Sequence, residues 1–78
     1  MIPLSTAQEG SLVRVVNVMS GKGLMLRLAE LGITPGSIVR VVKVFGSGPI
    51  LLDVKGSRIA IGRGAAMKIF VEVIGGER

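Results

Sequence analysis

Aliphatic residues recur along this chain at two different spacings, which separate a single helical stretch from several strands. Leu24, Leu28 and Leu31 are spaced so that they fall on one side of a helical wheel. Arg27 and Glu30 are expected on the other side of the same helix. Elsewhere the aliphatic residues alternate with polar ones or form short β-branched runs, which is typical of strands. We therefore expect a mainly β protein with one short α-helix.

The end of this helix is marked by a group of residues that favour a stop and a turn. Gly32 can adopt the positive φ that ends a helix, and Ile33 can then fold back onto Leu28, as in a Schellman motif. Pro35 and Gly36 are suited to turn the chain into the next strand. Gly32, Pro35 and Gly36 are therefore predicted to be structural turn residues.

The remaining pattern predicts about five strands. The expected strands are residues 12–19, 37–44, 50–55, 58–61 and 68–73. The third and fourth should form a hairpin that turns at Gly56 and Ser57. In the last strand, Ile69, Val71 and Val73 are expected to face inward.

Two stretches, residues 10–18 and 36–44, have nearly the same sequence. Each begins with Gly-Ser and continues with a run rich in valine that contains one arginine. In the first copy the alternation slips at Val15 and Val16, which predicts a bulged or bent strand. A solenoid would need at least three copies, so we interpret the pair as two bent barrel strands, each entered through a glycine turn.

Shorter turns are expected near both ends of the chain. Residues 5–10 read as one capped turn, closed by a capping box of Ser5 with Gln8 or of Thr6 with Glu9. Residues 62–67 can form one short helical turn, and residues 75–78 should fray.

Few short strands hide their edges most economically by rolling into a barrel. We therefore expect a small, partly open, SH3-like β-barrel, with the helix inserted after the first strand. The 78 residues should form a single domain, 1–78, with an ordered core from about residue 4 to residue 73.

Composition argues against an enzyme and against a bound cofactor. A chain of this size has room for one aliphatic core but not for an enclosed substrate cavity as well. It contains no His and no Cys, so the usual catalytic bases, nucleophiles and transition-metal ligands are missing. The five carboxylates are scattered along the sequence: Glu9, Glu30, Asp53, Glu72 and Glu77. We expect no catalytic residues, no metal site, no cofactor and no small-molecule substrate.

The distribution of apolar and charged residues bears on location and partners. No apolar stretch approaches the length of a membrane span, and the amino terminus lacks the features of a signal peptide, so a soluble protein is expected. The absence of cysteine fits a reducing cytoplasm. The net charge of +5 fits an acidic partner or, equally well, a need for solubility in a very apolar domain.

Three weaker signals have ordinary explanations. Gly21-Lys22-Gly23 lacks the other residues of a phosphate-binding loop. Gly62-Arg63-Gly64 could hold an anion through backbone amides, but a plain turn explains it better. A basic β-barrel could also bind nucleic acid, but Phe45 and Phe70 are the only aromatic residues available for stacking on bases.

Several of these segments together resemble the FeoA family, ferrous iron transport protein A. The resemblance covers residues 4–73 and is strongest at RLAELGITPG, residues 27–36. It continues through Gly-Pro at 48–49, the hairpin at 54–61 and AMKIFV at 66–71. It implies a bacterial or archaeal cytoplasmic SH3-like domain without catalysis, which acts with the FeoB-type membrane transporter and its cytosolic GTPase region.

By this resemblance the protein would meet the membrane only through its partner. The same fold also forms the carboxyl-terminal domain of iron- and manganese-dependent repressors of the diphtheria-toxin-repressor type, so a metal-regulator module is an alternative. We expect no winged-helix DNA reader within these 78 residues.

The helix carries our hypothesis for the partner surface. Lys22, Leu26 and Glu30 form a stripe opposite the core-facing leucines, and Met25 and Ala29 lie between the two sides. Because a short helix with a narrow core face does not need the extra apolar residues, a partner could cover them. The alternative is that the barrel wraps further around the helix, or that one exposed leucine has no function.

Overall fold

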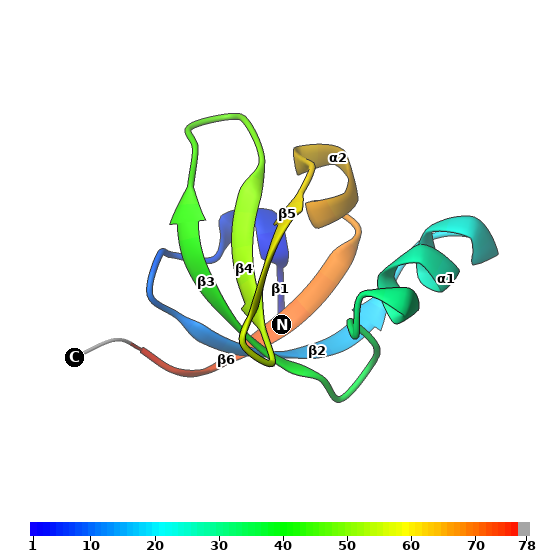
Figure 1. Cartoon of the computed structure of the whole chain (residues 1–78), viewed down its shortest axis with the longest axis horizontal. Helices are drawn as coiled ribbons and strands as arrows, with labels where there is room; N and C mark the ends of the chain where they lie inside the picture. The colour runs from blue at the N-terminus through cyan, green and yellow to red at the C-terminus, as the bar shows by residue number, and fades with distance from the viewer. Residues whose placement is uncertain (77–78) are drawn as a thin grey trace.

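The computed structural model describes residues 1–76, and its strands form one antiparallel sheet that curls into a small barrel (Figure 1). Along the sheet the strands lie in the order β1-β6-β2-β3-β4-β5. The strands are β1 (Ile2–Pro3), β2 (Leu12–Val18), β3 (Ile38–Val44), β4 (Ile50–Val54), β5 (Ser57–Ile61) and β6 (Ile69–Gly75). The helices are a 3-10 turn η1 (Leu4–Thr6), α1 (Lys22–Glu30) and α2 (Arg63–Ala66). The predicted fold class, a mainly β, SH3-like barrel with one helix after its first long strand, is confirmed.

The sixth strand, β1, was not predicted. It has only two residues, Ile2 and Pro3, which pair with Val71 and Phe70 of β6. Two residues are too few to show a periodicity, so nothing in the local pattern could reveal this strand. At the other end, Gly75 lies in β6 opposite Leu12, so the expected fraying is wrong there. Glu77 and Arg78 lie outside the described residues.

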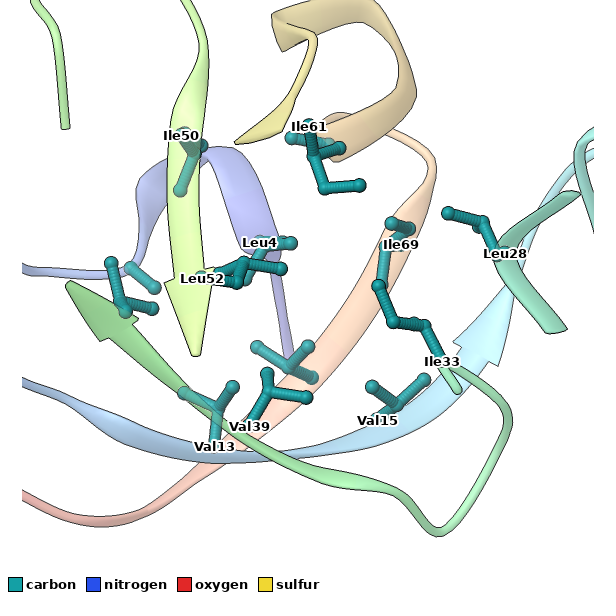
Figure 2. Close-up of a cluster of buried hydrophobic side chains, with 14 of the residues drawn as sticks. Leu4, Val13, Val15, Leu28, Ile33, Val39, Ile50, Leu52, Ile61 and Ile69 are labelled. Atoms are coloured by element: carbon teal, nitrogen blue, oxygen red, sulfur yellow. The ribbon is translucent and has the colours of Figure 1, made fainter. Parts of the chain in front are cut away.

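The core is aliphatic and fills the inside of the barrel (Figure 2). Because side chains alternate across a strand, Ile50, Leu52 and Val54 of β4 share one face, and this face is buried. Ile69 and Val71 of β6 are fully buried as well. The inward prediction for Val73 is wrong, since this side chain is 54% exposed. Val73 lies near the end of β6, beyond the two residues that pair with β1, so fewer neighbouring segments are available to cover its side chain.

The two similar stretches of sequence form neighbouring antiparallel strands, β2 and β3, and their backbones make the same contacts in each copy. In the first copy the Gly10 N–H donates to the Val41 carbonyl at 2.7 Å, and the Val41 N–H donates back to Ser11 at 2.9 Å. The second copy repeats this arrangement, with Gly36 donating to Val15 at 2.7 Å and Val15 donating to Ser37 at 2.8 Å. The repeat seen in the sequence is therefore also a repeat of the backbone structure.

Each copy also contains a register shift at the equivalent place. In β2 the shift against β6 falls between Val15 and Asn17, and in β3 the shift against β4 falls between Val41 and Lys43. The predicted bulge at Val15 and Val16 is thus confirmed, and β3 has its counterpart. Bulges bend a strand, which lets a sheet of so few strands close into a barrel.

The hairpin between β4 and β5 turns one residue earlier than predicted. Its two central residues are Lys55 and Gly56, which both have positive φ, +53° and +87°. Ser57 already lies in β5, paired with Val54. Two-residue hairpins need positive φ at both central positions, and here a lysine accepts the first of them. The Gly56 N–H also donates to the Asp53 carboxylate at 2.9 Å, which stabilises the turn.

The capping box expected in residues 5–10 is wrong. The expected single turn is also wrong, because the segment contains two turns. The first is η1, which no side chain caps, and the second lies at Glu9 and Gly10, where the Ser11 N–H donates to the Gln8 carbonyl at 3.1 Å. The Thr6 hydroxyl donates to the Pro3 carbonyl at 2.9 Å, and the Glu9 carboxylate accepts the Val44 N–H at 2.7 Å. Glu9 therefore ties the turn to β3 rather than closing it upon itself.

Over residues 1–76, no helix is both long and apolar enough to cross a lipid bilayer.

Candidate interaction surface

Helix α1 leaves the end of β2 and projects from the side of the barrel (Figure 1). It starts after Gly21, whose extended backbone (φ −75°, ψ 176°) occupies the N-cap position without a side-chain cap. It ends in a complete Schellman motif. The Ile33 N–H donates to the Leu28 carbonyl at 2.8 Å and the Gly32 N–H to Ala29 at 2.9 Å, with Gly32 at φ +87°. The predicted helix end is confirmed.

A second turn follows at once and directs the chain into β3. Pro35 precedes Gly36, which has φ +95°, as expected for the third residue of a type II turn. The Ser37 N–H closes the turn on the Thr34 carbonyl at 2.9 Å. The Ser37 hydroxyl donates to the Gly32 carbonyl at 3.0 Å and accepts the Thr34 N–H at 3.0 Å, so it joins this turn to the helix end. The structural roles predicted for Gly32, Pro35 and Gly36 agree with this geometry.

Only one side chain of α1 is buried. Leu28 is 2% exposed and points into the core near Ile33 and Ile69 (Figure 2). Leu24, one turn earlier, is half-buried against the same core. Most of the helix surface is therefore accessible.

The five residues proposed from the sequence lie on the exposed part of α1, with Lys22, Leu26 and Glu30 opposite Leu28 and with Met25 and Ala29 at its flank. We call Lys22, Met25, Leu26, Ala29 and Glu30 the outer face. All five are exposed, and the large apolar side chains stand out, with Leu26 64% and Met25 41% exposed. Among residues 1–76, no hydrogen bond or ion pair engages the Lys22 or Glu30 side chain. The outer face is thus open to solvent; its role in binding stays a prediction.

Two further exposed methionines lie near the point where α1 begins, and the sequence analysis did not identify them. Met19 is 60% exposed and Met67 is 57% exposed. The Met19 N–H donates to the Lys68 carbonyl at 2.7 Å, so the segments that carry these methionines are adjacent. They come from distant parts of the chain, and only the pairing of β2 with β6 brings them together.

The other side of the helix differs from the prediction at two residues. Leu31 was expected in the core but is 43% exposed, and Arg27 was expected on the opposite side from the leucines. Arg27 follows Leu24 by three residues and precedes Leu31 by four, so helical geometry places all three together. All three border a groove, and only Leu24 also packs against the core.

This groove lies between α1 and the end of the barrel and has a volume of about 160 Å³. Its lining residues are Leu24, Arg27, Leu28 and Leu31 from α1, and Ala60, Ile61, Gly62 and Ala65 from β5 and α2. The wall opposite α1 is formed by residues about 30 positions further along the chain. A local sequence pattern could therefore not predict this groove.

Residues 62–67 form the predicted short helical turn, and Arg63 has a structural role there. Its guanidinium donates to three carbonyl oxygens: Ser5 at 3.0 Å, Gly48 at 3.2 Å, and Gly46. Arg63 therefore ties η1, the 45–49 loop and α2 together. The interpretation of Gly62-Arg63-Gly64 as a plain turn fits this arrangement, because the guanidinium of Arg63 donates its hydrogen bonds to backbone carbonyls.

Within the described part of the chain, no three His, Cys, Asp or Glu side chains come close enough together to hold a metal ion. The accessible features of the structure are an exposed helix, a groove beside it and the aliphatic barrel behind both. These features define a small SH3-like domain that offers faces for contact.

The comparison with known proteins names the family. The FeoA domain family matches residues 2–73, and the chain belongs to it. It is 49% identical over 72 residues to the "Putative Fe(2+) transport protein A" of Methanocaldococcus jannaschii, covering 92% of this chain and 87% of that protein. The resemblance inferred from the sequence is thereby confirmed.

Solved structures agree. The chain superposes on a crystal structure of an iron uptake regulatory protein (FeoA) with a TM-score of 0.88 and 36% identity, covering 94% of this chain and 97% of the other. It also matches the apo form of the manganese-activated repressor ScaR, with a TM-score of 0.84 and 26% identity, over 94% of this chain but only 35% of the repressor. The fold therefore occurs both alone and as part of a longer regulator.

Proposed function

We propose that this protein is a non-catalytic accessory component of ferrous iron uptake that binds the cytosolic GTPase region of a FeoB-type membrane transporter. Its membership of the FeoA family supports a role in iron transport. The single observation that carries the binding role is the outer face of α1. The helix buries Leu28 but exposes the apolar side chains of Leu26 and Met25 to solvent. Exposed apolar surface of this kind is typical of a site that another protein covers.

The chemistry of the surface suits a protein partner. Leu26 and Met25, with Met19 and Met67 nearby, provide adaptable apolar contacts. Lys22 and Glu30 of the outer face can form directional polar contacts. The net charge of +5 would speed the encounter with an acidic surface. The membrane is then reached through the transporter, so the protein works in the cytoplasm, beside the inner face of the membrane.

The test is the affinity of the purified protein for the soluble cytosolic region of the transporter, measured by isothermal titration calorimetry. Leu26→Asp should weaken binding by about tenfold or more, because it places a carboxylate in the middle of an apolar contact. The helix should remain folded, since Leu26 is 64% exposed and contributes little to the core.

The matched control is Ile38→Asp. Ile38 is 50% exposed, but it lies on β3 rather than on α1, so this variant should bind like the wild type. If Leu26→Asp binds the transporter as tightly as the wild type, the outer face is not the interface. If the wild type shows no affinity for the transporter but binds RNA with a steep dependence on salt, the proposed function is wrong and the chain is a nucleic-acid binder.

A further inference from the structure

Strand β5 is an edge of the sheet and has hydrogen-bonding groups to offer. It pairs only with β4, since the sheet ends at β5. In a hairpin with a two-residue turn, the residues that flank the turn form a hydrogen-bonded pair, and the pairs then alternate. Val54 and Ser57 are the flanking pair, so Arg58 and Ala60 fall at the non-hydrogen-bonded positions. Their N–H and C=O groups therefore point away from β4.

Within residues 1–76, nothing else engages these four groups. No backbone or side-chain hydrogen bond involves the main chain of Arg58 or Ala60, and both residues are exposed. An accessible, unpaired edge is a template onto which another extended chain can add. The edge alone, however, does not say which chain.

The groove supplies the second half of a site. Ala60 belongs both to the free edge and to the groove, whose opposite wall is α1. A strand that added to β5 would thus run between an edge strand and a helix. One of its side chains would enter a pocket of about 160 Å³, which Leu24, Leu28 and Leu31 line on the helix side. Peptide-binding domains use this combination, in which main-chain pairing gives affinity and a pocket beside the strand gives specificity.

Charge selects the partner. Arg27 lines the groove and, among the described residues, forms no hydrogen bond or ion pair. Arg58 stands on the edge with its side chain 62% exposed, and its contact with Asp53 is long, at 3.9 Å. Lys55 adds a third positive charge at the start of the strand. Such an edge repels a second copy of this basic chain and attracts an acidic one.

We propose that the groove between α1 and β5 binds an extended acidic peptide, which pairs with the free edge of β5, inserts one aliphatic side chain between the two elements and places a carboxylate beside Arg27. This site goes beyond the proposed function. It lies on the side of α1 opposite Leu26, and its test contains no transporter, so either proposal can fail while the other stands.

The probe is a panel of capped hexapeptides in which Val, Leu, Ile or Met occupies a central position and Glu the positions on either side. They are titrated into the isotopically labelled full-length protein and followed by NMR. At least one peptide should bind, and the amides of Arg58 and Ala60 should shift and become protected from hydrogen exchange. The amides of Ser57 and Ile59, which already bond to β4, should keep their protection.

Two changes separate strand addition from simple charge attraction. N-methylation of the peptide residue that faces Ala60 should reduce affinity by about tenfold or more, because it removes a main-chain donor and blocks approach to the edge. Arg27→Glu should reduce affinity by a similar factor. Lys43→Glu makes the same change of charge on an exposed residue of β3 and should leave the affinity within about twofold.

Three results would overturn the proposal. The first is that no peptide of the panel binds at about 1 mM. The second is that the N-methylated peptide binds as well as its parent. The third is that Lys43→Glu weakens binding as much as Arg27→Glu, which would reduce the effect to net charge.

Discussion

Two glycines on either side of Leu28 meet different requirements. Gly32 has φ +87°, and a Cβ built there would stand 3.4 Å from the Cγ1 atom of Val54. Gly23 is the second residue of α1, has no positive φ and has nothing within 4 Å of such a Cβ. The same substitution should therefore change stability in opposite directions at these two positions.

Gly32→Ala should lower the free energy of unfolding by about 1 kcal/mol, because an L-residue is strained in the left-handed region. Gly23→Ala should raise the stability of α1 by roughly 0.5–1 kcal/mol, because alanine has the higher helix propensity. Urea denaturation of the two variants beside the wild type measures both. A Gly32→Ala protein as stable as the wild type would show that the backbone at this turn relaxes.

Arg63 illustrates how a residue with an apparent chemical role can be structural. Its guanidinium serves three carbonyls from separate segments: Ser5, Gly46 and Gly48. A cation with five N–H donors is suited to that task, and no neutral side chain of similar length can replace it.

Arg63→Met should lower the free energy of unfolding by roughly 2 kcal/mol, because three carbonyl oxygens lose a charged donor. Arg58→Met removes an arginine whose ion pair with Asp53 is exposed and should change stability by less than about 0.5 kcal/mol. Thermal unfolding of both variants is the measurement. Equal stability of the two would mean that water replaces the Arg63 contacts without loss.

At the scale of the element, α1 shows what local sequence can and cannot tell. Its end at Gly32 was predictable because the Schellman stop depends on adjacent residues. The exposure of Leu26 was predictable from helical spacing. The exposure of Leu31 was not predictable, because it depends on how much of the barrel reaches the helix. The groove was not predictable either, because its second wall begins at Ala60, far along the chain.

Leu28 is the only buried side chain of α1. Truncation of Leu28 should therefore let the helix detach from the barrel or unfold locally while the barrel stays folded. In Leu28→Ala, hydrogen exchange of the α1 amides should accelerate strongly, and the amides of β2 and β6 should remain protected. Leu26→Ala, an equal truncation on the exposed side, should leave exchange in α1 nearly unchanged. Uniform acceleration across the barrel in Leu28→Ala would show that helix and barrel unfold as one unit.

At the scale of the whole molecule, the barrel was predictable because its strands alternate, its turns contain glycine and its core is uniformly aliphatic. The missing pieces are non-local. β1 has two residues, which form a strand by pairing with β6, and the exposure of Val73 depends on which other segments reach the end of β6. Neither feature is recorded in the residues around it. The candidate outer face came from one helix and needed no tertiary information, whereas the peptide groove needed the complete fold.

The paired repeat of β2 and β3 has a consequence for how the molecule can change. The two copies hold each other through Gly10, Val15, Gly36 and Val41, and α1 lies in the connection between them without taking part in those bonds. The backbone bonds that join the two copies therefore do not depend on α1, which adds Leu28 to the core and leaves most of its other side chains exposed. We expect that sequences that keep both glycine turns and Leu28 can change the exposed residues of α1 with little loss of folding stability, so that the contact surfaces of relatives can differ.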